Sequence, residues 1–401
     1  MDAFFSELGR TVLARWKAVD FSLPAFPPIA QAALEENPPA EQVDLAAFIR
    51  EFLIEDEQPF QTASGFGQPE IVAYDHPRFY IQLLFWMDGT TDIHQHEFSG
   101  AFHVMAGSSL HSEFEFDNAE SVTAHFRVGD LRLKGTELLE TGATVPITSG
   151  RGCIHALFHL DTPSVTVVVR THSDPGTGPQ FTYLPPHVAV DPVHHDALTM
   201  RRKQLLDVLE RVGDPDYAEL ALAMVEELDF ERGFFILQNG IGALRGLGAW
   251  EDVLGAFEAK HGARARGVAA TLEEILRRDG IVALRAAVED PEHRFFLALL
   301  LNLTNRADIL DLVAQRFPGD AIETVLRWAA ELADASDGAW LVDAEFPEEI
   351  AVDEEEQADV FLTALQGYLT GAETTGDLAA EDAAALREAL ARSSWRVLAA
   401  G

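Results

Sequence analysis

Residues 87–107, MDGTTDIHQHEFSGAFHVMAG, decide the fold of this chain. His94 and His96 are two residues apart, and alternate side chains of a β-strand share one face, so both imidazoles can reach the same atom. A second stretch, residues 146–172 (PITSGRGCIHALFHLDTPSVTVVVRTH), passes from a glycine-containing turn into a strand that starts near His155. Together the two stretches predict a metal site built from three strand-borne histidines.

The region from about residue 65 to residue 185 has the composition of a β-structure. Its short runs are rich in β-branched and aromatic residues, and Gly, Asp, Asn, Ser and Thr separate them. The runs are RFYIQLLFWM, AFHVMAG, LHSEFEF, VTAHFRV and SVTVVVRTH. Many short strands with turn signals and no helices between them predict an antiparallel sandwich or a closed barrel.

Helical patterns flank this β-region on both sides. Residues 1–64 form a predicted N-terminal helical cap, in which AEQVDLAAFIREFLIE carries apolar residues at helical spacing. Residues 186–197 form a proline-rich connector, and residues 198–401 show one amphipathic helical pattern after another. Because such short helices must bury their faces against one another, we expect an all-helical C-terminal domain. Its expected role is structural or interactive, with a protein or peptide as the partner.

The predicted fold class is therefore α+β. It comprises the helical cap, an antiparallel β-barrel over residues 65–185 that carries the metal site, and the all-α C-terminal domain.

Composition excludes two classes of partner and indicates a cellular location. The chain has 66 acidic and 29 basic residues, a formal net charge of -37, so we expect no binding to the phosphate backbone of nucleic acids. No apolar run is long enough to cross a membrane, and the N-terminus lacks the features of a secretory signal. Cys153 is the only cysteine, which is typical of a cytoplasmic protein without disulfides.

The two histidine stretches resemble the motifs of the cupin superfamily. The first cupin motif reads roughly G-x5-HxH-x3,4-E-x6-G, and this chain has one residue fewer after the opening glycine. The residues that match the two motifs are Gly89, His94, His96, Gly107, Gly152 and His155. The resemblance covers about residues 70–175 and implies a small antiparallel jelly-roll barrel with a metal ion inside.

The chain departs from the cupin motif at its glutamate ligand. That position falls on Gly100, with Ala101 beside it, and neither side chain can bind a metal. In this respect the chain resembles the cysteine dioxygenase branch, the thiol dioxygenases, whose iron is held by three histidines. The resemblance implies Fe(II) on His94, His96 and His155, with O2 as a co-substrate. Zinc, nickel, copper and manganese stay open as alternative metals.

A three-histidine site has a consequence for the substrate. Neutral imidazoles leave a divalent ion with its full charge and open coordination positions, which favours an anionic, chelating substrate. The tyrosine in the late strand of the thiol dioxygenases falls here on Arg170. We expect Arg170 to face inward and to pair with an anionic group of the substrate. The alternative is that Arg170 ends its strand in solvent.

Three further residues have both a functional and a structural interpretation. The second cupin motif reads roughly G-x5-PxG-x2-H-x3-N, and His159 takes the position of its asparagine. His159 also shares a strand face with His155, so it could contact substrate or support the site. The alternative is a structural barrel histidine whose hydrogen bonds are all made within the barrel. His103 is expected on the opposite strand face from Gly100, as a core or surface residue. Cys153 could line the pocket, but a small buried hydrophobe is the expectation.

The sequence thus predicts a non-heme Fe(II)-dependent dioxygenase. It would act with O2 on a small anionic molecule, a thiol being favoured, or on a peptide side chain, with Arg170 and His159 as the candidate catalytic residues. Two alternatives stay open. One is a metal-dependent cupin isomerase or lyase that turns over without O2. The other is a non-catalytic ligand- or peptide-binding cupin whose helical domain recruits a partner.

Overall fold

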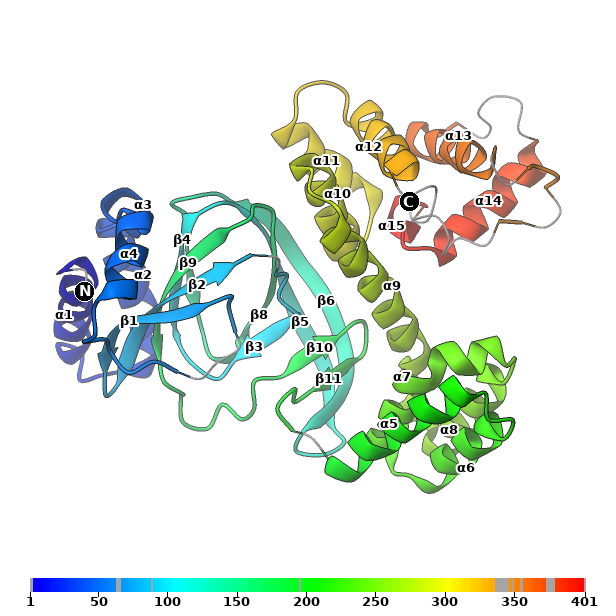
Figure 1. Cartoon of the computed structure of the whole chain (residues 1–401), viewed down its shortest axis with the longest axis horizontal. Coiled ribbons are helices and arrows are strands. Elements are labelled where there is room, and N and C mark those ends of the chain that lie inside the picture. The colour runs from blue at the N-terminus through cyan, green and yellow to red at the C-terminus, as the bar shows by residue number, and fades with distance from the viewer. Residues whose placement is uncertain are drawn as a thin grey trace.

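The computed structural model in Figure 1 describes residues 3–62, 66–87, 89–194, 196–335, 346–347, 350–353, 356–372 and 379–399. N-terminal helices are followed by an antiparallel β-structure and then by a second helical region, so the predicted α+β layout is confirmed. The predicted boundary at residues 64 and 65 lies outside the described residues. Among the described helices, none combines the length and the apolarity needed to span a membrane.

Two antiparallel sheets form the β-structure. The first has five strands in the order β1 (Glu70–His76), β2 (Phe79–Trp86), β9 (Ser164–Thr171), β4 (Gly100–Ala106) and β7 (Thr144–Ile147). The second closes into a barrel in the order β10 (Thr182–Leu184), β11 (Val188–Val190), β6 (Phe126–Leu139), β5 (Ser109–Ser121), β8 (Gly150–His159) and β3 (His94–His96). Strand β11 lies in the stretch expected as a connector, where it pairs with both β10 and β6.

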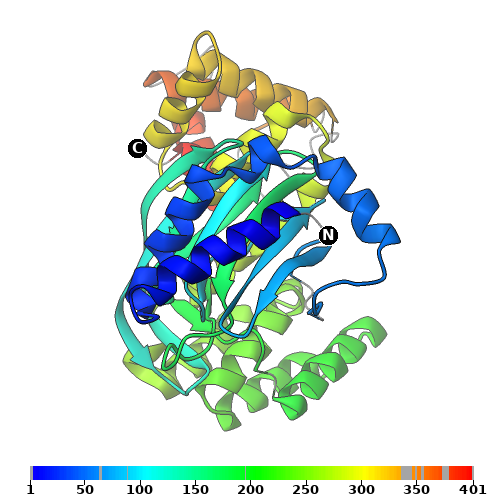
Figure 2. The same ribbon diagram turned by 90° about the vertical axis from the view of Figure 1, so that its left-hand side faces the viewer.

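The N-terminal helices cover the outer face of the five-stranded sheet, as Figure 2 shows. They are α1 (Ala3–Lys17), η1 (Leu23–Ala25), α2 (Phe26–Glu36), α3 (Pro39–Gln42) and α4 (Leu45–Ile54). Helix α1 turns Phe5, Leu8, Val12 and Trp16 inward at intervals of three and four residues, which is the spacing of one helix face. Helix α4 begins at Asp44, whose carboxylate accepts a hydrogen bond from the Ala47 backbone N–H at 3.0 Å.

The central strands β2 and β9 alternate between this helical layer and the interior of the β-structure. Ile81 and Val167 pack under the helices, whereas Gln82 and Val168, one residue further on, line an internal cavity. Strand β2 is consequently buried along its whole length and is apolar on both faces apart from Gln82. This two-residue period fixes which side chains can reach the interior.

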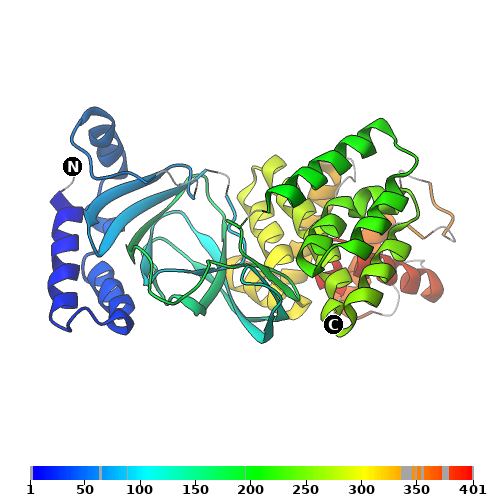
Figure 3. The same cartoon turned by 90° about the horizontal axis from the view of Figure 1, so that it is seen from below.

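The first half of the C-terminal helical region lies beside the barrel (Figure 3), and its apolar side chains cluster with Phe126 and Val188 of the barrel strands. It consists of α5 (Ala197–Val212), α6 (Tyr217–Glu227), α7 (Phe230–Gly246), α8 (Trp250–His261), η2 (Gly262–Ala265) and the start of α9 (Val268–Ala287). Phe126 of β6 packs edge-on against Phe230 and Phe234 of α7, with ring centroids 5.6 and 5.2 Å apart. The helices therefore pack against β6 and β11 through an apolar cluster that is distinct from the cluster around the internal cavity.

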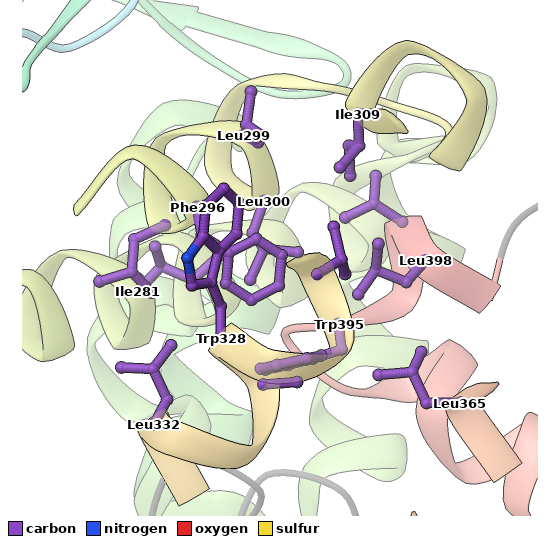
Figure 4. Close-up of a cluster of buried hydrophobic side chains, with 14 of the residues drawn as sticks. Ile281, Phe296, Leu299, Leu300, Ile309, Trp328, Leu332, Leu365, Trp395 and Leu398 are labelled. Carbon is purple, nitrogen blue, oxygen red and sulfur yellow. The ribbon is translucent and has the colours of Figure 1, made fainter. Parts of the chain in front are cut away.

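The second half forms another core, shown in Figure 4, around Phe296, Trp328 and Trp395. Its helices are α10 (Pro291–Asn302), α11 (Arg306–Arg316), α12 (Ala321–Ala335), α13 (Gln357–Thr370), α14 (Ala380–Arg392) and α15 (Arg396–Ala399). This core extends to the barrel through Leu110, Phe158 and Leu160.

Candidate metal centre

Three histidines converge at the junction of two paired strands. His94 and His96 extend from β3, and His155 extends from β8, directly opposite His94 in the strand register. They are 5%, 4% and 2% exposed, and their candidate ligand atoms all lie within 4.8 Å of one another. The structure thus brings together the three residues that the sequence predicts as ligands, in a group able to hold a metal ion.

The donor atoms of these histidines fit a divalent ion. The Nε2 atoms of His96 and His155 lie 2.8 Å apart. Two nitrogens bound at right angles, at roughly 2.0–2.1 Å from one ion, would be about 2.9 Å apart. His94 donates its Nδ1 proton to the Asp92 carbonyl at 2.7 Å, and its buried Nε2 has no hydrogen-bond partner. This arrangement leaves a lone pair free for a metal, as in protein metal sites where a backbone carbonyl orients the ligand.

Burial also sets the charge of the histidines. It is the main cause that lowers the pKa of His94, His96 and His155 below the ordinary value for histidine. The three rings are therefore neutral near pH 7, which is the form that binds metals.

The position of the missing glutamate is closed by the packing of two strands. Gly100 of β4 lies opposite Arg170 of β9, and a Cβ added to Gly100 would be 2.0 Å from the Val169 carbonyl oxygen. That oxygen belongs to the backbone of a central strand, so it cannot swing aside as the end of a side chain can. A residue with any side chain, a glutamate included, does not fit here without moving the strands.

A cavity of about 40 Å³ lies against the three histidines. It is lined by Phe66, Gln82, Leu84, Trp86, Thr91, His94, His96, Phe98, Phe102, Ile147, His155, Leu157, Thr166, Val168 and Arg170. The volume corresponds to about three water-sized groups at roughly 10–15 Å³ each. Among the residues that the structure describes, the lining includes one guanidinium, that of Arg170, and no carboxylate, so the charged side chain on this lining is positive.

Arg170 therefore faces the interior, which is the side of the sheet expected from the alternation of side chains along its strand. Its guanidinium carbon lies 3.4 Å from the centroid of the Phe98 ring, and that ring lies 4.5 Å from the ring of His96. The side chain also donates hydrogen bonds to the carbonyls of Thr171 and His172, both at 3.2 Å. One aromatic ring thus separates the guanidinium from a candidate metal ligand.

His159 lies outside the cavity lining. Its ring stacks on Trp86, with centroids 4.5 Å apart and planes inclined by 16°, and its Nδ1 is 2.9 Å from the Ser109 hydroxyl. Burial lowers the pKa of His159 to about 3, so the ring is neutral. Trp86, in contrast, does line the cavity. A catalytic role of His159 stays a prediction, and any effect on a ligand would pass through Trp86.

The other two residues with a double interpretation also lie away from the cavity. His103 is fully buried, its Nδ1 is 2.8 Å from the Thr144 hydroxyl, and burial lowers its pKa to about 4. Cys153 is partly exposed as a whole residue, but burial of its thiol raises the pKa to about 12. Neither residue is among those that line the cavity.

Sequence reasoning missed three polar residues near the centre. His111 of β5 has its Nε2 3.0 Å from Nδ1 of His155, and its Nδ1 is 3.1 Å from a carboxylate oxygen of Glu137. Gln82 is 2% exposed, lines the cavity, and has a carbonyl oxygen without a hydrogen-bond partner. The alternation of side chains along β2 could have indicated that Gln82 faces the interior, since an amide side chain stands out in an otherwise apolar and aromatic strand that is buried at every position.

Comparisons with known proteins add little to this geometry. No protein-family model matches the chain, and no curated protein matches it. A solved structure of hydroquinone 1,2-dioxygenase from Sphingomonas sp. TTNP3 with 4-hydroxybenzoate bound is similar at 14% identity and a TM-score of 0.22, over 30% of this chain and 81% of that chain. The DMSP lyase DddQ from Ruegeria pomeroyi DSS-3 is similar at 18% identity and a TM-score of 0.24, over 44% of this chain and 95% of that chain. Because both TM-scores are low, the fold and the site rest on the geometry described above.

Proposed function

We propose that this chain is a cupin-type metalloenzyme that oxidises a small anionic molecule with O2, a thiol being the favoured substrate. The observation that carries the proposal is the composition of the cavity. It joins three neutral imidazoles to one guanidinium, and the lining residues that the structure describes include no carboxylate.

The protein side of this chemistry follows from the cavity. A divalent ion on His94, His96 and His155 keeps its full positive charge, because neutral ligands remove none of it. Arg170 adds a second positive charge one aromatic ring away. Two positive centres that line one small cavity select a short molecule with two negative groups, such as a thiolate and a carboxylate.

Bound Fe(II) would supply the open coordination positions at which a thiolate and O2 react, so that both oxygen atoms end on sulfur as a sulfinate. The residues of this chain hold and orient the substrate. Arg170 binds its carboxylate, while Trp86, Phe98 and Phe102 exclude water from the reacting atoms.

The first experiment measures metal content by elemental analysis in wild type and in His155→Ala purified side by side. We expect about one divalent ion per chain in wild type and a loss of most of it in the variant. The iron-loaded wild type is then given small thiols that carry a carboxylate, and O2 uptake is followed together with sulfinate formation by mass spectrometry.

The outcomes separate the proposal from its alternatives. Stoichiometric O2 uptake with sulfinate formation supports it. A metal-dependent reaction of a carbonyl substrate under argon would instead make the chain an isomerase or lyase. Metal binding without turnover of any substrate would make it a binding protein, and no metal binding after anaerobic loading with Fe(II) would reject the centre itself.

A further inference from the structure

Two of the three candidate ligands are held through their Nδ1 atoms, His94 by a backbone carbonyl and His155 by a side chain. Of the three histidines, His155 alone donates to another side chain that is itself held by a third, and this chain of contacts leads from the centre of the barrel to its surface. His111, the middle residue, is 1% exposed, whereas the side chain of Glu137 is 61% exposed.

Strand pairing places these three residues on adjacent strands. His111 of β5 is directly opposite Glu137 of β6, and His155 of β8 is opposite Glu113, two residues along β5 from His111. The contacts are therefore fixed by the backbone ladders of the barrel rather than by a flexible loop.

We propose that His111 and Glu137 are positioning residues that hold His155 in its metal-binding tautomer and orientation, and thereby raise the affinity of the centre for a divalent ion. This inference rests on the proposed metal centre and adds to it a residue pair that orients one ligand.

The tautomers follow from the chemistry of a carboxylate. Ionised Glu137 can only accept a hydrogen bond, so the proton of a neutral His111 lies on Nδ1, at 3.1 Å from the carboxylate. Nε2 of His111 then carries a lone pair and accepts from Nδ1 of His155 at 3.0 Å. As a result, the lone pair of His155 lies on Nε2, the atom that faces Nε2 of His96.

The pair also supplies a negative charge that the centre otherwise lacks. Gly100 closes the position of a carboxylate ligand, and none of the described residues that line the cavity carries a carboxylate. Through two imidazoles, Glu137 polarises the bond between His155 and an ion without binding the ion itself. The centre keeps three neutral ligands and its open positions, and it still gains part of the charge compensation that a glutamate ligand would give.

The test compares the dissociation constant for Co(II), measured by competition with a chelator, across pairs of variants. His111→Phe removes the contact, whereas His111→Gln keeps an acceptor for His155 and a donor for Glu137. We expect His111→Phe to weaken Co(II) binding about 10- to 100-fold, which is the usual effect of losing such an outer contact, and His111→Gln to restore most of it. The Co(II) absorption spectrum should change in His111→Phe, since the orientation of one ligand changes.

Glu137→Gln tests the charge at an exposed position where folding is not at risk, and it should weaken Co(II) binding several-fold. The matched controls are His103→Phe, a buried histidine of the five-stranded sheet that is hydrogen-bonded to Thr144, and Glu115→Gln, an exposed barrel carboxylate paired with Arg132. Melting of the metal-free proteins reports any change in folding separately.

Equal Co(II) affinity of wild type, Glu137→Gln and Glu115→Gln would overturn the inference, as would equal loss in His111→Phe and His103→Phe. Should His111→Phe fail to fold, the two glutamate variants decide the matter. If wild type and both controls bind no metal, the proposed centre itself is wrong, which is a distinct result.

Discussion

Replacing Gly100 with alanine would place a methyl group between the backbones of two paired strands. The added Cβ would lie 2.0 Å from the Val169 carbonyl oxygen and 3.0 Å from Cα of Arg170, whereas ordinary van der Waals contact begins at 3.4 Å. Strand β4 or β9 would have to move by more than 1 Å, because 3.4 minus 2.0 is 1.4 Å. Overpacking a well-ordered core costs about 1–3 kcal/mol, and a clash against backbone has no rotamer to relieve it. We expect Gly100→Ala to lower the free energy of unfolding by about 3 kcal/mol or more.

Urea unfolding followed by circular dichroism measures this loss. Gly135→Ala is the matched control, because Gly135 lies in strand β6 and its added Cβ would meet nothing within 4 Å. Gly135→Ala should change stability by less than about 1 kcal/mol. If the two variants are equally stable, the strands yield easily, and the argument that strand packing excludes a carboxylate ligand is refuted.

Three other outcomes follow from the same structure. Arg170→Ala should weaken binding of an anionic substrate roughly 10- to 100-fold without loss of metal, as expected for the loss of one charge-assisted hydrogen bond. The control Arg127→Ala removes a guanidinium that stacks on Phe181 and does not line the cavity, so it should leave substrate binding unchanged. Equal effects of the two substitutions in a binding titration would reject the role of Arg170. Because burial lowers the pKa of His159 from 6.5 to about 3, its neutral ring contributes stability that is present above pH 6.5 and is lost as the pH falls toward 3. Between pH 7.5 and 4.5 wild type should lose about 2.5 kcal/mol more than His159→Gln in urea unfolding, and parallel losses would show that His159 does not titrate in this way. With its pKa raised to about 12, Cys153 should react with a thiol reagent at pH 8 roughly 1000-fold more slowly in the native protein than in urea, and rapid native labelling would contradict that.

The grouping of the three candidate ligands could be predicted because its signal is local. His94 and His96 lie on one short strand, and a turn followed by a strand places His155, so the alternation of side chains carries most of the information. The same alternation predicts the inward direction of Arg170 on β9. The fold class followed from a change in the pattern of apolar residues along the chain, from helical spacing to short β-rich runs and back to helical spacing.

The positioning pair could not be predicted, because its contacts depend on the register between strands. His111 reaches His155 only because β5 pairs with β8, and it reaches Glu137 only because β5 pairs with β6. In the sequence, His111 is a single histidine in a β-rich run with no motif around it.

Some of the secondary structure depends on packing between elements and could not be predicted from the sequence pattern alone. Helix α7 contains several glycines, which are unfavourable in helices and weaken its signal in the sequence. At Gly233 an added Cβ would lie 2.9 Å from the Phe257 ring, so this glycine lets α7 and α8 approach closely. Within the run 122–128, expected as a single strand, residues 122–125 form the bend between β5 and β6, and only Phe126 onward belongs to a strand.

The shared core between barrel and distal helices bears on how this chain can be divided. Leu110 and Phe158 are fully buried among helical residues, and Arg285 of α9 donates to the His159 carbonyl at 2.6 Å. A barrel cut off before residue 198 would expose these apolar side chains to water and leave that carbonyl without its donor. The helical region thus covers one face of the strands β5 and β8, and a piece of this protein that keeps these strands and the candidate site intact must include helices beyond residue 198.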